Sequence, residues 1–274
     1  YLLNLSTHDY IMIFTNKGKV YRLKGYEIPE FSRQSKGLPI VNVLPVEKDE
    51  KISSIIKLNV ENQEKYLILA TKQGLIKRTN LEEFENIRAT GKICIKLKEN
   101  DELIGVKKTN GESNILLASS EGRMNVFDEN EIRVMGRTAS GVKGINLGSA
   151  KCVSIENVND DDNIVIVTEN GYGKKTLISE YRKTKRGSKG VKALNITEKN
   201  GNIASIKKVI DDSDIMIITN QGIIIRLPLE QVSQLGRVTQ GTRLINLKSG
   251  QKVSSVSLVQ KEKESEEEII EKNE

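Results

Sequence analysis

The feature of this sequence that most restricts its fold is a segment that recurs five times along the chain. Each copy is a short apolar run, then a turn that ends in Gly, then a second run that mixes apolar and basic residues. The turn glycines are Gly18, Gly74, Gly122, Gly171 and Gly222, so successive copies lie 48 to 56 residues apart. Gly readily adopts the positive φ that closes a short turn between two strands. Each copy therefore predicts a β-hairpin.

A second repeated segment, a short basic loop, follows each predicted hairpin. Each copy begins with Arg and contains a Gly three or four residues later. The five copies are RQSKG (33–37), RATGK (88–92), RTASG (137–141), RGSKG (186–190) and RVTQG (237–241). Two further apolar, alternating segments come after each loop, and each of them predicts a strand. Four-stranded units that repeat about every 50 residues are typical of a propeller-like ring of packed sheets.

The sequence therefore predicts an all-β fold with five full units over residues 1–259. The first six residues, YLLNLS, stand where the last strand of an earlier unit would lie, which predicts a parent ring of six units with the missing part upstream. The last fifteen residues, 260–274, hold three Lys and seven Glu, a net charge of −4. We expect this segment to be an acidic tail without fixed structure.

Composition limits the functions that this chain can perform. No apolar run approaches the roughly 20 residues that span a membrane, and no signal peptide is evident, so we expect a cytoplasmic protein without a membrane partner. Cys94 and Cys152 lie in apolar runs, which indicates two buried free thiols in a reducing compartment. His8 lies in a predicted surface turn, and the acidic cluster at 159–163 indicates a solvated turn between units. We therefore assign no catalytic residue, metal or cofactor to this chain.

The charge of the chain is unevenly distributed. The formal net charge is +6, so residues 1–259 carry +10 once the acidic tail is set aside. Loops rich in Gly, Arg and Lys and poor in acids would form a basic track on the rim of a ring, and such a rim can bend duplex DNA through its phosphates. KTKRGSKG (183–190) is the richest of these stretches. The predicted DNA-binding residues are Arg33, Lys36, Lys77, Arg78, Arg88, Lys92, Arg137, Lys143, Lys174, Lys175, Lys183, Lys185, Arg186, Lys189, Arg237 and Arg243.

Several segments resemble the C-terminal DNA-wrapping domain of the bacterial DNA gyrase A subunit. They are STHDYIMIFTNKGKVYRLKGYEIP, GLPIVNVLP, GKICIKLKENDELIGV, RVMGRTASGVKGINLG and ENGYGKKTLISEY, and the likeness runs from residue 1 to about 259. The resemblance implies a six-bladed β-pinwheel, a propeller-like ring whose neighbouring blades exchange strands. It also implies that double-stranded DNA wraps on the rim and that this wrap directs strand passage toward negative supercoiling.

The same resemblance implies partners and a location. The partners would be the DNA-cleaving N-terminal domain of the same polypeptide and a separate ATPase subunit, in an A2B2 holoenzyme associated with the nucleoid. ATP binding and DNA cleavage would then lie outside this chain, which is left without catalytic residues of its own.

Two alternatives remain open at this point. The family's hallmark box, Gln-Arg-Arg-Gly-Gly-Lys-Gly, is not found; KRGSKG (185–190) and RQSKGLP resemble degenerate copies of it. A parent protein without that box would point to the related subunit of topoisomerase IV, which decatenates DNA. The other alternative is a propeller scaffold that binds proteins or other polyanions, and it would bind DNA weakly and without dependence on DNA length.

Overall fold

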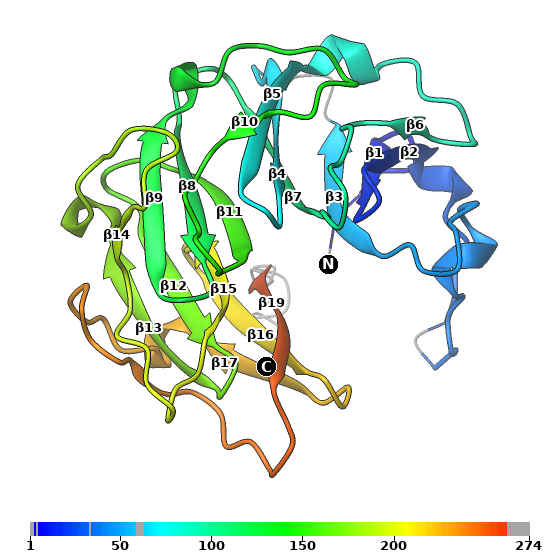
Figure 1. Cartoon of the computed structure of the whole chain (residues 1–274). Coiled ribbons are helices and arrows are strands. Elements are labelled where there is room, and N and C mark those ends of the chain that lie inside the picture. Colours follow the sequence, from blue (N-terminus) through cyan, green and yellow to red (C-terminus); the bar gives the residue numbers. More distant parts are fainter. Residues whose placement is uncertain (1–2, 4, 33, 59–62, 262–274) are drawn as a thin grey trace, which may run out of the picture.

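The computed structural model describes residues 3, 5–32, 34–58 and 63–261, and it forms five antiparallel β-sheets. The sheets, here called blades, follow one another in sequence order around an arc (Figure 1). Each blade takes a hairpin and an inner strand from its own unit of the repeat. Blades 1 to 4 each take a fourth, outer strand from the next unit. The chain is therefore tied together by strands exchanged between neighbouring units.

The strands run from the inside of the arc outward in the same order in every blade. Blade 1 is β3 (Ile52–Leu58), β1 (Tyr10–Thr15), β2 (Lys19–Lys24) and β6 (Lys92–Ile93); blade 2 is β7 (Leu103–Thr109), β4 (Tyr66–Thr71), β5 (Leu75–Asn80) and β10 (Val142–Lys143); blade 3 is β11 (Cys152–Val158), β8 (Asn114–Ser119), β9 (Arg123–Asp128) and β14 (Val191–Lys192); blade 4 is β15 (Ile203–Lys208), β12 (Asn163–Thr168), β13 (Tyr172–Leu177) and β18 (Thr242–Arg243); blade 5 is β19 (Val253–Gln260), β16 (Ser213–Thr219) and β17 (Ile224–Pro228).

Apolar side chains hold the blades against one another rather than filling one central core. Between blades 3 and 4, for example, Leu116 and Val126 share a buried cluster with Ile164 and Ile166. Similar clusters fill the spaces between the other neighbouring blades. Full burial of one such aliphatic side chain stabilises the fold by roughly 1.5–3 kcal/mol. Because a blade packs on both faces, both faces of its middle strands are buried.

The predicted all-β, propeller-like fold with four-stranded sheets is confirmed, as is the exchange of strands implied by the resemblance. The number of blades differs, because the described residues form five blades rather than six. The strand predicted at residues 1–6 lies largely outside the described residues, and Leu3, Leu5 and Ser6 belong to no strand. The predicted acidic tail lies outside them from residue 262 onward, beyond the end of β19.

The two ends of the arc depart from the predicted four strands per blade. Blade 5 has only three strands within the described residues. In the first unit, the segment predicted as an outer strand (38–46) contains the 3-10 helix η2 (Ile40–Asn42) instead and is mostly exposed. The equivalent segments of the other units pair with the hairpin of the preceding blade, and this one has no such edge to pair with in the structure.

The remaining elements are short connectors between the hairpins and the basic loops. They are the 3-10 helices η1 (Gly25–Glu27), η3 (Leu81–Phe84), η4 (Glu129–Glu131), η5 (Ile178–Glu180) and η6 (Leu229–Gln231). Within the described ranges no helix is long and apolar enough to cross a membrane.

The minor residues singled out in the sequence lie where they were expected. Cys94 and Cys152 are buried free thiols, and burial raises the pKa of each to about 12. His8 lies in an exposed turn. Asp160 and Asp162 of the acidic cluster form ion pairs with lysines, at 3.0 and 2.7 Å, rather than facing one another around a metal.

Candidate nucleic-acid interface

The outer strands β6, β10, β14 and β18 place a repeated position on the outside of the arc. In three of these four strands the second residue is an exposed cation: Lys143, Lys192 and Arg243. The side chain of Arg243 stacks over the ring of Tyr172 and donates to its hydroxyl from both Nε and Nη2, at 3.1 and 2.9 Å. The sequence analysis missed Lys192, although it occupies the same repeat position as Lys143.

In three of the five basic loops, the Arg that begins the loop ties it to the outer strand of the neighbouring blade. Its Nη1 donates to a main-chain carbonyl oxygen in that strand, in three successive pairs: Arg137 to Ile93 at 2.5 Å, Arg186 to Lys143 at 2.6 Å and Arg237 to Lys192 at 2.7 Å. The repeated Arg therefore has a structural role in the ring. It also brings the cations of one unit beside those of the next.

A carboxylate holds each of these loops at a second point. The backbone N–H of the loop Arg donates to a Glu of the preceding unit's 3-10 connector, at 2.7–2.9 Å; the acceptors are Glu83, Glu131 and Glu180. The loops themselves carry no acid, but each therefore has one carboxylate beside it. The positive charge of the rim is correspondingly lower than a count of the loop residues suggests.

In four of the five loops the Gly near the end lies against the second hairpin strand of the preceding unit, whereas Gly37 of the first loop meets no neighbouring atom of the described residues. Gly141 has φ +88°, and a Cβ placed there would lie 2.6 Å from the carbonyl oxygen of Ile76 in the blade beneath. Gly190 likewise has positive φ and lies against the backbone of Met124. The close approach that these glycines permit is to the hairpin of the preceding unit, which replaces the interpretation that they let the backbone approach DNA.

The basic stretch 183–190 presents the densest group of cations on the rim. Lys185 and Lys189 are exposed and form no ion pair within the described residues, whereas Lys183 pairs with Asp160 at 3.0 Å. The interior of the loop is fixed by the hydroxyls of Thr184 and Ser188, which both donate to the side-chain oxygen of Asn125. A loop held by these hydrogen bonds thus presents to solvent two ammonium groups without an ion-pair partner in the described part of the chain.

Lys192 lies opposite a second cation on the outer edge of blade 3. In the antiparallel pair of β14 and β9, Lys192 is the register partner of Arg123, whose side chain is also exposed. Like charges directly opposite each other on two strands are destabilising. Here Arg123 Nη1 donates to the carbonyl oxygen of Gly190 at 3.1 Å, and Lys192 Nζ donates to Asn195 Oδ1 at 2.8 Å. The pair places two cations side by side on the outer edge of blade 3.

Three of the predicted DNA-contact residues are buried in the interior. The prediction that their side chains touch DNA is therefore wrong for this structure. Lys77 and Lys174 are 0% exposed, and their ammonium groups donate to backbone carbonyls of the basic loops. Arg78 is 8% exposed and donates to Asn130 at 2.9 Å. The physical reason is that both faces of a blade are packed, so that a basic residue in the middle of a hairpin strand points inward.

The other predicted residues divide by exposure. Arg33 lies outside the described residues, Lys36 and Arg88 are exposed, and Lys92 and Lys175 are half-buried. No described contact links Lys36 to the loops of blades 2 to 4. The structure thus brings together one set along the outer edge: Lys143, Lys185, Arg186, Lys189, Lys192, Arg237 and Arg243.

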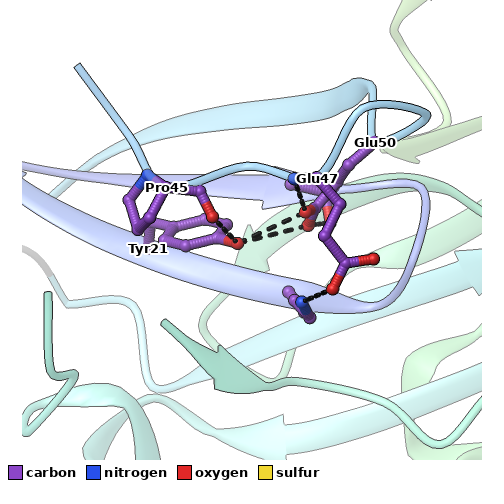
Figure 2. A network of polar contacts seen from close by, with 6 residues as sticks. Tyr21, Pro45, Glu47 and Glu50 are labelled. Carbon is purple, nitrogen blue, oxygen red and sulfur yellow. Dashed lines mark hydrogen bonds and ion pairs between the residues drawn. The ribbon is translucent and has the colours of Figure 1, made fainter. Parts of the chain in front are cut away.

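Blade 1 is constructed differently beneath its loop. Tyr21 occupies the position equivalent to Lys77, and its ring lies directly under Gly91. Figure 2 shows the Tyr21 hydroxyl between the carbonyl oxygen of Pro45, at 3.3 Å, and the carboxylate of Glu50, at 3.3–3.4 Å. Burial beside this carboxylate raises the pKa of the Tyr21 hydroxyl. The neutral Tyr21 thus fills in blade 1 the place that a basic side chain holds in blade 2.

Comparison with known proteins connects this geometry to a family. The family model described as "DNA gyrase C-terminal domain, beta-propeller" matches residues 9–59, 65–110, 113–159, 162–210 and 213–260, one match for each unit. The chain belongs to this family. The five matches correspond to the five blades, so the gyrase C-terminal domain family shares the repeat on which the rim is built.

Related proteins agree with this assignment. The DNA gyrase A subunit of Staphylococcus epidermidis is 49% identical over 265 residues, which cover 95% of this chain and 30% of that protein. Its counterpart in Staphylococcus aureus is 48% identical over 97% of this chain. The chain therefore spans about 30% of the length of these curated relatives.

Two solved structures share the fold. The C-terminal domain of DNA topoisomerase IV superposes with a TM-score of 0.83 at 28% identity, covering 93% of this chain and 80% of that one. The DNA gyrase A C-terminal domain superposes with a TM-score of 0.79 at 26% identity, covering 93% and 83%. The fold alone does not separate gyrase from topoisomerase IV, whereas the high sequence identity is to the gyrase A subunit.

Proposed function

We propose that this chain binds double-stranded DNA on the outer edge of its blades and bends it along the arc. The observation that carries the proposal is the set of exposed cations on successive outer strands and loops, joined by Arg186 and Arg237 across blades 2 to 4. Their repetition along a curved edge suits the backbone of a duplex rather than its bases. Bending a short site by 40–90° costs roughly 1–6 kcal/mol, which several phosphate contacts can offset.

In a parent protein of the gyrase type, this bend would wrap DNA and set the direction of strand passage. Membership of the family supports the role, together with the 49% identity to a gyrase A subunit. We accordingly propose a cytoplasmic, nucleoid-associated site of action. The partners we propose are the cleavage domain of the same polypeptide and the separate ATPase subunit of the A2B2 holoenzyme.

The C-terminal domain of topoisomerase IV is the second candidate, because its structure superposes with the higher TM-score. Such a domain would bend DNA without a strong chiral wrap. The measurement that separates the two candidates is a topology assay. The chain is bound to nicked circular DNA, the nick is sealed with ligase, the protein is removed, and the linking-number distribution is read.

For the gyrase role we expect a linking-number shift of one sign that grows with protein concentration. Binding seen by gel mobility without any shift would favour the topoisomerase IV role. Absence of DNA binding at low salt would contradict both candidates. The remaining alternative is a propeller scaffold that binds polyanions non-specifically. Such a protein would bind DNA without changing its linking number and without preferring longer duplexes.

We further propose that the arc belongs to a six-bladed ring. Val41 is 55% exposed, although its equivalents in the other units (Ile95, Ile145, Leu194 and Ile245) are buried in strand exchange. At the other end of the arc, Ile224 is 58% exposed in the edge strand β17, which pairs only with β16 among the described residues. One further unit would supply both missing contacts, a hairpin for the segment around Val41 and an outer strand for β17.

A further inference from the structure

One position of the repeat lies directly beneath the basic loops: the third residue after the hairpin glycine. It is occupied by Tyr21, Lys77, Asn125, Lys174 and Ile225 in blades 1 to 5. In blades 2 to 4 a basic loop of the next unit lies over it, and the residue is Lys, Asn and Lys. In blade 5 no loop covers it among the described residues, and it is Ile225.

The two lysines at this position are buried without a counter-ion. Lys77 Nζ donates to the carbonyl oxygens of Cys94 and Arg137, and to that of Gly136 at 3.4 Å. No ion pair of Lys77 is found in the described part of the chain. Burying a charge is costly, and an apolar residue at the same place would avoid that cost.

Lys174 repeats this arrangement two blades further along. Its Nζ donates to the carbonyl oxygens of Gly236 and Arg237, at 2.8 and 2.7 Å, and to the hydroxyl of Thr239 at 3.3 Å. In both blades the ammonium therefore binds the two carbonyl oxygens that flank the loop's first residue, that of the preceding Gly and that of the Arg itself. The backbone N–H of the same Arg is held from the other side by Glu83 or Glu180.

The Asn in blade 3 serves the same purpose with a neutral amide. Asn125 Nδ2 donates to the carbonyl oxygens of Lys185, at 3.3 Å, and Gly144, at 3.0 Å. Three successive loops are thus fastened from below, by two different chemistries. The common element is a donor for inward-facing loop carbonyls, not a positive charge.

We propose that Lys77 and Lys174 are positioning residues, which fix the basic loops at 136–141 and 236–241 so that DNA follows a defined path over blades 2 and 4. This inference rests on the proposed DNA-binding function. The two ammonium groups do not touch DNA. They hold the loop backbone, and through it the arginines that join one unit's cations to the next.

The test compares Lys174→Met with Lys174→Gln, and Lys77→Met with Lys77→Gln. Both replacements remove the charge, but Gln keeps an amide donor like that of Asn125. A Lys65→Met variant loses the same charge from an exposed side chain and serves as the control. The readouts are the linking-number shift on nicked circular DNA, hydrogen exchange of the loop amides, and the melting temperature.

We expect Lys174→Met to lose most of the linking-number shift while still binding DNA. Hydrogen exchange should rise by about fivefold for each net hydrogen bond lost, only in the loop at 236–241. Lys77→Met should act in the same way on 136–141 alone. The Gln variants should keep most of the shift, and Lys65→Met should match the wild type.

The proposal is overturned if the Met and Gln variants lose wrapping equally, because the charge itself would then be what matters. Met variants that wrap and exchange like the wild type also overturn it. If a Met variant fails to fold, the Gln variant decides, since it must restore both folding and loop protection. A wild type that shows no linking-number shift contradicts the proposed function, while hydrogen exchange still reports whether the lysines hold the loops.

Discussion

Replacing three exposed lysines of blade 3's outer edge should flatten the salt dependence of DNA binding. The variant is Lys185→Gln, Lys189→Gln and Lys192→Gln. All three side chains are exposed, and none forms an ion pair in the described part of the chain. Arg186 is left unchanged because its guanidinium anchors the loop to Lys143, so the change removes charge without releasing the loop.

The size of the effect follows from the number of phosphate contacts. Each contact contributes about −0.9 to the slope of log affinity against log salt concentration, so the loss of three should flatten the slope by about 2.7. Between about 50 and about 200 mM salt, one contact accounts for roughly a 3.5-fold change in affinity and three contacts for about 40-fold. Fluorescence anisotropy of a labelled duplex, titrated with protein at a series of NaCl concentrations, measures the slope.

The control variant removes the same charge from elsewhere on the surface. Lys65, Lys98 and Lys151 are exposed and lie outside the basic loops and outer strands, so their change to Gln should leave the slope almost unaltered. A rim variant with the wild-type slope and an unchanged melting temperature would refute phosphate contact by these lysines. Equal flattening in both variants would refute a localised track.

Three further predictions concern stability and closure. Gly141→Ala should lower the free energy of unfolding by about 1–3 kcal/mol, measured in urea. Gly37→Ala should cost less, because a Cβ at Gly37 would meet no neighbouring atom among the residues that the structure describes. Burial lowers the pKa of Lys77 and Lys174 to about 8 from 10.5, so the unfolded chain binds more protons above pH 8. Stability should therefore rise by about 1 kcal/mol per lysine from about pH 8 to 9, and not in the double Met variant. Finally, the Cys of an Ile224→Cys variant should be alkylated rapidly in this chain and slowly in the full parent protein.

The sequence was sufficient to predict the hairpins and their number, for a physical reason. A turn that needs positive φ selects Gly, and the apolar runs around it alternate as strands do, so both signals are local. Gly18, Gly74, Gly122 and Gly171 all have positive φ at hairpin turns. The pairing partner of an outer strand cannot be read from local sequence, because it lies far away along the chain. The two-residue strand Val142–Lys143, for example, pairs with a hairpin more than 60 positions earlier.

The inward direction of Lys77 and Lys174 could not be deduced from alternation. In a sheet with one solvent face, a Lys beside an apolar residue would point to water. In this ring, β5 is buried at four consecutive positions, because a neighbouring blade covers each face. The usable signals were Tyr21 and Ile225 at the equivalent position in the first and last units, which show that the position is not reserved for charged side chains.

The repeated and the variable residues of the loops therefore carry different information. Arg137, Arg186 and Arg237 recur because each ties a loop to the neighbouring blade, and they would recur in a ring that bound nothing. The positions just before the loop Gly are free of that constraint, and they differ: Lys189 in one loop corresponds to Gln240 in another. If phosphate contacts come from these variable positions, the loop at 186–190 should dominate DNA binding. Transferring Lys189 to the loop at 237–241, as Gln240→Lys, should then steepen the salt dependence by about one contact, or roughly 0.9 in slope.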